Sequence, residues 1–254
     1  MIIFHADLDN TLIYSYKHDI GADKVCVEVY QGRNISFMTK KSVELLKVIH
    51  DKILVVPTTT RTIEQYRRID MGITTPHYAL VCNGGVLLVD GEEDLEWFEA
   101  SERLVASSVP ELKKAEQLLL LDGNINFEIR NIKGLFLFTK SKAPEQTIAG
   151  LKKVLDLSLV DVFVNGAKVY VVPITLSKGI AIQRFREKMK PDYVIAAGDS
   201  DFDVPMLNEA DISLAPMELR EQITNENEGL FCERRQQLFS EAVLHFVHNK
   251  IARV

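Results

Sequence analysis

Four short apolar runs in this chain each end in a cluster of polar residues. The runs are continuously apolar rather than alternating, which is typical of strands buried on both faces of a parallel sheet with helical crossovers. In such sheets, ligands bind beyond the carboxyl ends of the strands. We therefore predict an α/β protein whose polar clusters converge in one crevice. The runs are residues 2–4, 53–56, 78–81 and 193–197, and the clusters are residues 7–11, 57–60, 83–85 and 198–200.

The segments between these runs predict helices and one antiparallel element. Apolar residues recur near helical spacing in residues 43–49 and 180–189, which indicates crossover helices. Val25, Val27 and Val29 alternate with other residues before a turn at residues 31–34. This pattern predicts a β-hairpin flap just after the first polar cluster.

The pattern changes between residues 86 and 173, where we predict two helices and two pairs of strands. Asn165-Gly166 is a strong hairpin signal between the last two strands. The chain is therefore expected to form a Rossmann-like parallel-sheet core from residues 1–85 and 174–254, with residues 86–173 as an inserted, smaller α+β domain. The predicted helices of this insert are residues 101–121 and 145–155, and its strands are residues 125–130, 134–139, 160–164 and 168–172.

Charge and composition exclude several classes of protein. The formal net charge of −6 provides no global attraction to nucleic acid or anionic lipid, so an anionic substrate requires a local positive site. No apolar run approaches the roughly 20 residues of a membrane span, and the first residues do not resemble a signal peptide. Three widely spaced cysteines indicate reduced thiols. We expect a cytoplasmic protein with no nucleic-acid or membrane partner; no sequence signal specifies an oligomeric state.

Paired aspartates follow the first and the last of the apolar runs. Asp7 and Asp9 follow the first, and Asp199 and Asp203 follow the last. Each pair could simply form a polar turn that caps the next segment. If the pairs share a crevice, two charges roughly 4 Å apart repel by about 4 kcal/mol at an effective dielectric of about 20. A protonated carboxylate or a cation relieves such repulsion, and Mg²⁺ suits oxygen ligands. A carboxylate can also attack phosphorus.

Three other features complete this pattern. Lys178 begins a predicted helix, where the helix dipole is mildly unfavourable to a cation unless the cation faces an anionic cluster. Thr58, Thr59 and Thr60 offer hydroxyl and N–H groups for phosphate, although threonines also simply favour strands and turns. Asn83-Gly84 forms either a plain tight turn or part of such a site. Each feature alone has an ordinary structural explanation, and the ordered set is much more specific.

This ordered set resembles the haloacid dehalogenase superfamily of phosphohydrolases, in its Cof-type and sucrose-phosphatase-like branch, over nearly the whole chain. Asp7-Leu8-Asp9-Asn10-Thr11 looks like the first motif of the family. The resemblance implies that Asp7 is the nucleophile and a Mg²⁺ ligand. It implies that Asp9 is the general acid and then the base, and binds the metal through its backbone carbonyl. Thr59 is similar to the second-motif threonine that holds the phosphoryl oxygens, and Lys178 to the third-motif lysine that neutralises Asp7 and the phosphate.

The remaining motif residues complete the predicted site. Gly198-Asp199-Ser200 and Asp203 look like the fourth motif, which implies that Asp199 ligates the metal and Asp203 supports it. Asn83-Gly84-Gly85 is similar to a loop near the bound phosphate. The predicted catalytic residues are Asp7, Asp9, Thr59 and Lys178; the predicted metal ligands are Asp7, Asp9, Asp199 and Asp203; and the predicted substrate-binding residues are Thr59, Thr60, Arg61, Asn83, Gly84 and Lys178.

Three residues depart from the pattern of the family. Asn10 replaces a glycine, and asparagine tolerates positive φ well. Thr60 replaces the glycine after the second-motif threonine, which tightens the backbone there. Phe202 stands where the fourth motif has asparagine, so one polar group beside the metal is lost.

The resulting prediction is a Mg²⁺-dependent phosphomonoester hydrolase that acts on a small molecule through an aspartyl-phosphate. A sugar phosphate is the first choice of substrate, and nucleotide, flavin-precursor and pyridoxal phosphates stay open. The insert is expected to be a cap that selects the substrate; its candidates are Arg130, Asn131, Lys133, Asn165 and Lys168. The alternatives are a phosphomutase of the same superfamily and a catalytically silent binding module. A phospho-signalling receiver is a weaker alternative because receivers are about half this length.

Overall fold

The computed structural model of this chain describes residues 1–224, 229–233 and 237–252. The chain divides into two compact units. The first unit is Met1–Asp94 with Ser177–Val254, and the second is Leu95–Leu176.

The core of the first unit is a five-stranded parallel sheet in the order β15-β14-β13-β1-β5. Ala6 pairs with both Pro57 and Ala197, so β1, β5 and β13 end in register at the same edge. This sheet confirms the predicted α/β fold with parallel strands. Two of its strands, β14 and β15, come from a segment in which the sequence predicted no strand. The bounds are β1 Ile2–Ala6, β5 Leu54–Pro57, β13 Tyr193–Ala197, β14 Ile212–Pro216 and β15 Gly229–Cys232.

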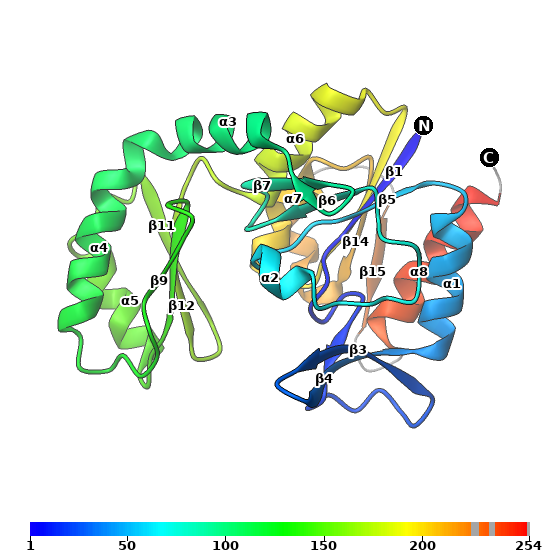
Figure 1. Cartoon of the computed structure of the whole chain (residues 1–254), viewed down its shortest axis with the longest axis horizontal. Coiled ribbons are helices and arrows are strands. Elements are labelled where there is room, and N and C mark those ends of the chain that lie inside the picture. Colours follow the sequence, from blue (N-terminus) through cyan, green and yellow to red (C-terminus); the bar gives the residue numbers. More distant parts are fainter. Residues whose placement is uncertain (225–228, 234–236, 253–254) are drawn as a thin grey trace. The chain divides into compact units, whose positions relative to one another are not determined.

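Helices cover both faces of this sheet (Figure 1), with α1 and α8 on one side and α6 and α7 on the other. The α1 and α8 helices meet through a hydrogen bond between the Ser42 and Ser240 hydroxyls, at 3.1 Å. On the other face, Val194 packs with Ile182 of α6 and Met206 of α7 in one buried cluster. The bounds are α1 Lys40–His50, α6 Lys178–Met189, α7 Val204–Asn208 and α8 Phe239–Ile251.

The first unit also carries two small antiparallel sheets. One of them, β2-β4-β3, contains the hairpin flap that the sequence predicted. The other is β6-β7-β8, and here the prediction that residues 78–81 form a further strand of the parallel sheet was wrong. The β6 strand pairs antiparallel with β7, and it runs parallel beside the end of β5 through a bridge between Thr58 and Leu80 and a hydrogen bond from the Thr59 N–H to the Leu80 carbonyl. The bounds are β2 Tyr14–Ser15, β3 Lys24–Tyr30, β4 Arg33–Thr39, α2 Ile63–Tyr66, β6 Tyr78–Val81, β7 Val86–Val89 and β8 Glu92–Glu93.

The antiparallel pairing of β6 also determines where the first unit stops. The turn after Val81 reverses the chain, so β7 and β8 stay beside β6. Residues 86–94, which were predicted to belong to the insert, therefore lie in the first unit. At the far boundary, residues 174–176 lie in the second unit instead of the core.

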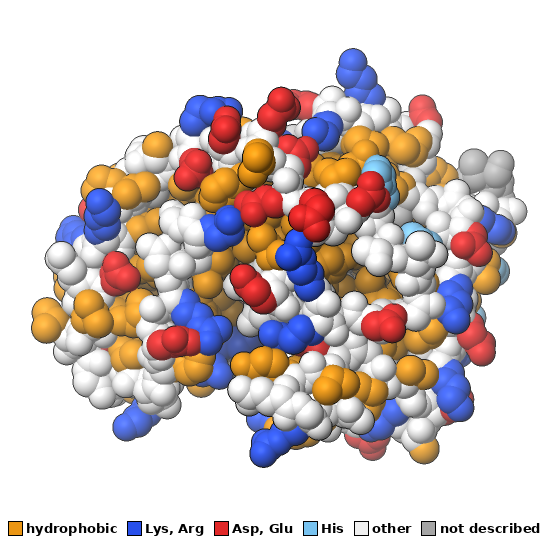
Figure 2. Space-filling model, in the orientation of Figure 1, with side chains coloured by type: hydrophobic (Ala, Val, Ile, Leu, Met, Phe, Trp, Pro, Cys, Tyr) orange, Lys and Arg blue, Asp and Glu red, His pale blue; other side chains and the backbone are white. Residues whose placement is uncertain are grey.

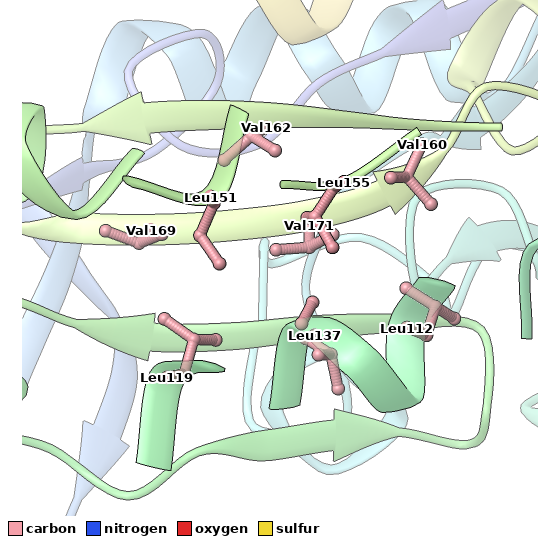
Figure 3. Close-up of a cluster of buried hydrophobic side chains, with 10 residues drawn as sticks. Leu112, Leu119, Leu137, Leu151, Leu155, Val160, Val162, Val169 and Val171 are labelled. Atoms are coloured by element: carbon pink, nitrogen blue, oxygen red, sulfur yellow. The ribbon is translucent and has the colours of Figure 1, made fainter. Parts of the chain in front are cut away.

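The second unit is an antiparallel sheet in the order β11-β12-β10-β9, with its core on one face. Leucine and valine side chains from this face and from the helical segments form one buried cluster (Figure 3). The bounds are α3 Leu95–Val105, α4 Val109–Leu121, β9 Arg130–Ile132, β10 Phe136–Lys140, α5 Pro144–Lys152, β11 Val160–Asn165 and β12 Lys168–Pro173.

Two predictions for the second unit need correction. The single helix expected at residues 101–121 is two helices, separated by a 3-10 turn at Ala106–Ser108. Pro110 follows at the start of α4, where its missing N–H is tolerated, whereas inside a longer helix it would remove a hydrogen bond. The strand expected at residues 125–130 is displaced to Arg130–Ile132. The Asn165-Gly166 hairpin between β11 and β12 is present as predicted.

On the face that Figure 2 shows, neither positive nor negative side chains predominate. Figure 2 shows Lys and Arg side chains interspersed with Asp and Glu side chains. Within the described ranges, no helix has both the length and the apolar composition needed to cross a membrane.

Candidate active site

The candidate site lies at the carboxyl end of the parallel sheet, where the chain leaves β1, β5 and β13. Backbone hydrogen bonds hold these exits together. The Asp7 N–H donates to the Ala197 carbonyl at 2.9 Å, and the Thr58 N–H donates to the Ala6 carbonyl at 2.8 Å. The sheet therefore places the first, second and fourth predicted motifs side by side, although they are far apart in the sequence.

Three aspartates and one lysine form the centre of the site. Carboxylate oxygens of Asp7, Asp199 and Asp203 lie within 4.8 Å of one another. The Lys178 Nζ donates to Asp7 Oδ1 at 2.5 Å and to Asp203 Oδ1 at 2.6 Å. Lys178 is buried at the start of α6, so its charge faces the two carboxylates rather than water. The structure thus brings four of the predicted residues into one cluster.

A loop after β13 holds Asp203 in place. The Asp203 Oδ2 atom accepts hydrogen bonds from the backbone N–H groups of Asp199 and Ser200, both at 3.0 Å, and from the Ser200 hydroxyl at 2.8 Å. Together with Lys178, these donors satisfy both oxygens of a fully buried carboxylate. Phe202 does not break this arrangement, because Ser200 and the backbone provide the donors.

Burial and the ion pairs with Lys178 act in opposite directions on the pKa values of Asp7 and Lys178. Burial raises the pKa of the Asp7 carboxyl well above its ordinary value, the Lys178 ammonium opposes that rise, and the other carboxylates, led by Asp203, add to it. Burial alone would lower the pKa of Lys178, but the Asp203 and Asp7 carboxylates outweigh it and raise that pKa above its ordinary value.

The donor set of this cluster fits a divalent cation. Three carboxylates beside one ammonium leave an excess of negative charge, and all the available ligand atoms are oxygens. Such hard oxygen ligands are the ones that Mg²⁺ prefers. Asp7, Asp199 and Asp203 are the residues that would hold it. Arg61 engages the Asp9 carboxylate, and the metal ligand predicted from Asp9 is its backbone carbonyl, which that ion pair does not involve.

The Asp9 carboxylate forms a two-pronged ion pair with Arg61. Arg61 Nε donates to Asp9 Oδ2 at 2.7 Å, and Nη2 donates to Oδ1 at 2.8 Å. The third nitrogen, Nη1, lies 2.9 Å from Glu28 Oε2. The guanidinium that the sequence assigned to substrate binding thus points at two carboxylates of its own chain.

Thr59 and Thr60 follow β5 with ordinary backbone geometry. Thr59 is fully buried, and its hydroxyl accepts a hydrogen bond from the Arg61 N–H at 3.2 Å. Thr60 stands where the family has a glycine, and its φ is not positive. Its backbone is therefore not strained by a left-handed conformation. Asn10 does adopt positive φ, at 61°, as its place in the first motif predicts.

Three consecutive residues with positive φ form the turn after β6. Cys82, Asn83 and Gly84 have φ of 53°, 59° and 83°. The Asn83 N–H donates to the Thr59 carbonyl at 3.0 Å, which ties the turn to the second motif. A Cβ at Gly84 would lie 2.3 Å from the Ala181 Cβ of α6. The glycine therefore lets this turn pack against the helix that carries Lys178.

Replacing Gly84 by alanine is expected to destabilise the protein and to reduce activity. The added methyl group would collide with Ala181, and α6 would have to shift. Overpacking and the positive φ each have a cost, and we expect a loss of about 2–4 kcal/mol in the free energy of unfolding. Chemical denaturation measures this loss. Gly91→Ala is the matched control, because Gly91 also has positive φ but has no atom within 4 Å of an added Cβ. Equal losses in the two variants would contradict the packing role.

Sequence reasoning missed Glu28, which pairs with Arg61, and it missed Ser36 and Arg68, which both contact Glu28. In a regularly alternating strand, Val25, Val27 and Val29 would share one face and Glu28 would lie on the other. The register of β3 against β4 shifts on both sides of Glu28, so Glu28 is buried whereas Val25 and Val29 are exposed. A β-bulge of this kind reverses which residues face inward, and residue spacing alone does not reveal it.

Comparison with known proteins identifies the family to which the chain belongs. The model of the haloacid dehalogenase-like hydrolases matches residues 97–226, which is about half of the chain. The chain belongs to the haloacid dehalogenase-like hydrolases. This membership confirms the resemblance found in the sequence and the predicted enzyme class, a hydrolase of the haloacid dehalogenase type. No curated protein matches the sequence.

Solved structures with low identity share the fold over nearly the whole chain. The sucrose-phosphatase of Synechocystis, solved with sucrose and phosphate, has a TM-score of 0.68 at 15% identity, and the match covers 98% of this chain and 97% of that one. A trehalose-6-phosphate phosphatase of Aspergillus fumigatus has a TM-score of 0.56 at 14% identity, with 100% and 93% covered. A phosphatase of the same superfamily from Bacteroides thetaiotaomicron has a TM-score of 0.54 at 16% identity, with 97% and 95% covered.

Proposed function

We propose that this hydrolase removes phosphate from small phosphomonoesters in a Mg²⁺-dependent reaction through an aspartyl-phosphate. The observation that carries the proposal is the buried Lys178 ammonium between Asp7 and Asp203, with Asp199 in the same cluster. It combines a carboxylate nucleophile, a fixed positive charge and a set of oxygen ligands in a member of a hydrolase family. These are the components that phosphoryl transfer requires.

The first step is attack of the Asp7 carboxylate on phosphorus. A bond forms between Asp7 and phosphorus while the bond from phosphorus to the alcohol oxygen breaks, and Asp9 gives a proton to the departing alcohol. Lys178 and the Thr59 hydroxyl stabilise the negative charge of the transferring oxygens. A bound Mg²⁺ would add Lewis-acid stabilisation of the same oxygens.

The second step is hydrolysis of the aspartyl-phosphate. Asp9 is now ionised and takes a proton from water, and the water oxygen bonds to phosphorus. The bond between phosphorus and the Asp7 oxygen breaks, which releases inorganic phosphate and restores both carboxyl groups to their initial states. Lys178 balances the charge of Asp7 before and after each turnover.

A sugar phosphate of the kind handled by the Cof-type and sucrose-phosphatase-like branch is the proposed substrate. Neighbours in fold include a sucrose-phosphatase and a trehalose-6-phosphate phosphatase, which supports this class. We assign the selection of the substrate to the second unit, because one face of its sheet carries aromatic side chains and an arginine. On the sheet face away from its core, strand pairing puts Arg130, Phe138, Tyr170 and Phe163 in one row. Phe138 and Phe163 are partly exposed, and aromatic faces suit the C–H groups of sugars. Free thiols at the three cysteines support a cytoplasmic location.

Release of inorganic phosphate from a panel of sugar, nucleotide and cofactor monophosphates tests this function. We expect release that requires Mg²⁺, stops with EDTA and resumes when Mg²⁺ is added back, with a sugar phosphate as the best substrate. Release from a nucleotide alone would contradict the substrate class. Transfer of the phosphoryl group to a second sugar hydroxyl, without free phosphate, would contradict hydrolysis.

A further inference from the structure

Four charged side chains with alternating signs run from the candidate site through Glu28 of the flap to Arg68, which follows α2. Asp9 pairs with Arg61, Arg61 with Glu28, and Glu28 with Arg68. Glu28 Oε2 also accepts a hydrogen bond from the Ser36 hydroxyl at 2.7 Å. Arg68 approaches Glu28 Oε1 with Nε at 3.0 Å and Nη2 at 2.9 Å. The two oxygens of Glu28 therefore serve different partners: Oε2 holds Arg61 and Ser36, and Oε1 holds Arg68.

Burial increases along this row from Asp9 to Glu28 and then decreases at Arg68, whose side chain is 28% exposed. The side chain of Asp9 is 52% exposed, that of Arg61 is 12% exposed, and that of Glu28 is 0% exposed. A buried carboxylate is tolerated only with charged or hydrogen-bonding partners, and Glu28 has three. Glu28 therefore anchors Arg61 from the interior of the protein, on a strand that the catalytic motifs do not include.

The anchored guanidinium fixes the direction of the Asp9 carboxylate. Bidentate pairs between arginine and a carboxylate restrict both distance and angle. Without this contact, an aspartate that is half exposed can change rotamer freely. All three Arg61 nitrogens have carboxylate partners, since Nε and Nη2 face Asp9 and Nη1 faces Glu28. This geometry suits a residue that orients Asp9 more than one that binds substrate.

We infer that Glu28 is a positioning residue for Asp9 and that it acts through Arg61. The inference rests on the proposed function, in which Asp9 transfers the proton. A catalytic group displaced by about 1 Å can lose on the order of 100-fold in rate. Glu28 touches neither the substrate nor the reacting atoms, so its effect must appear in proton transfer and not in phosphate binding.

The variant Glu28→Gln tests the inference, because it keeps the shape of the side chain but replaces one acceptor with a donor. The amide oxygen can face only one arginine. The two donors of Arg68 attract it to the Oε1 position, which turns the amide N–H groups toward Arg61 and displaces the guanidinium. We expect kcat/KM for an alkyl phosphate such as a hexose monophosphate to fall by about 10- to 100-fold. We expect KM to change little.

Comparison of leaving groups separates positioning from structural damage. p-Nitrophenolate departs without a proton, so the step that forms the aspartyl-phosphate needs no general acid for p-nitrophenyl phosphate. We therefore expect the loss of kcat/KM in Glu28→Gln to be several-fold smaller for p-nitrophenyl phosphate than for the hexose monophosphate. Equal losses for the two substrates would overturn the inference.

A second substitution at Arg68 provides the rescue. In Glu28→Gln combined with Arg68→Met, the amide oxygen no longer has Arg68 to face and can accept from Arg61 and Ser36. We expect the double variant to recover most of the activity that Glu28→Gln loses on the hexose monophosphate. If Glu28 only anchors the flap, the additional loss of Arg68 should lower the activity further. A double variant that is no more active than Glu28→Gln would therefore overturn the positioning role of Glu28.

Two controls keep this test separate from the proposed function. Arg68→Met alone removes one partner of Glu28 without touching Arg61, and we expect near wild-type kcat. Thermal unfolding of each variant shows whether it is folded at the assay temperature. If the wild type releases no phosphate from any substrate, the proposed function fails; if the wild type is active and Glu28→Gln is equally active, only the positioning role fails.

Discussion

Replacement of Asp7 by asparagine is expected to abolish turnover and to leave the fold intact. The amide has the shape of the carboxylate, and its oxygen can still accept from the Lys178 ammonium, which lies 2.5 Å from Asp7 Oδ1 in the wild type. An amide oxygen is a far weaker nucleophile toward phosphorus, so no aspartyl-phosphate forms. Loss of a catalytic nucleophile costs on the order of 10⁴- to 10⁶-fold in kcat. Release of inorganic phosphate in the presence of Mg²⁺ measures the loss.

The variant Asp201→Asn is the matched control for Asp7→Asn. Asp201 lies in the same loop as Asp199 and Asp203, but it is exposed and its Oδ1 accepts from the Gln222 side chain at 3.1 Å. We expect this variant to keep wild-type activity. Circular dichroism and thermal unfolding verify that both variants are folded. An Asp7→Asn protein with near-normal kcat would refute the assignment of the nucleophile.

Replacement of Lys178 by methionine is expected to reduce both stability and activity. Methionine has a similar length but no charge, so Asp7 and Asp203 would stay buried beside each other without their shared cation. Removal of one partner from a buried charge pair costs about 3–5 kcal/mol in the free energy of unfolding. Loss of one group that stabilises the transferring oxygens reduces kcat by about 10²- to 10³-fold. Denaturant unfolding and phosphate release measure the two effects separately.

Mg²⁺ should partly restore the stability of the Lys178→Met protein. A divalent cation that binds the folded state raises its stability by mass action, and the variant has more unbalanced negative charge than the wild type. We therefore expect a larger increase in Tm with Mg²⁺ for the variant. Lys188→Met is the control: Lys188 lies on the same helix, but its Nζ pairs with Asp94 at 3.0 Å, outside the cluster. Identical Mg²⁺ responses in all three proteins would contradict a metal site at these carboxylates.

The sequence predicted the sheet because its signals are local. A continuous apolar run predicts a doubly covered strand wherever the rest of the chain lies, as β1, β5 and β13 show. The same run at residues 78–81 misled the prediction, because β6 is equally apolar but pairs antiparallel with β7. Whether a buried strand joins a parallel or an antiparallel neighbour depends on the turn that follows it. Here that turn is built from three consecutive residues with positive φ.

The strands β14 and β15 had weaker signals. Ile212–Pro216 includes a serine and a proline, and Gly229–Cys232 begins with a glycine. Both are strands in the structure because they extend a sheet that already exists, with parallel pairing from β13 to β14 and on to β15. Tertiary pairing thus stabilises segments whose own strand preference is modest.

The sequence by itself determined which chemical groups stand at the ends of the core strands. Asp7, Thr59 and Asp199 follow strands whose apolar pattern is evident, and the register of a parallel sheet then brings those positions together. The resemblance to the family already implied the pairing of Lys178 with Asp7, whereas the partners of Arg61 were decided only by the tertiary structure. Arg61 turns to Asp9 and Glu28 because a bulge in β3 buries a glutamate where alternation predicts exposure. Ion pairs depend on distances between side chains remote in sequence, and hydrophobic periodicity, which records only which face of an element is buried, contains no information about those distances.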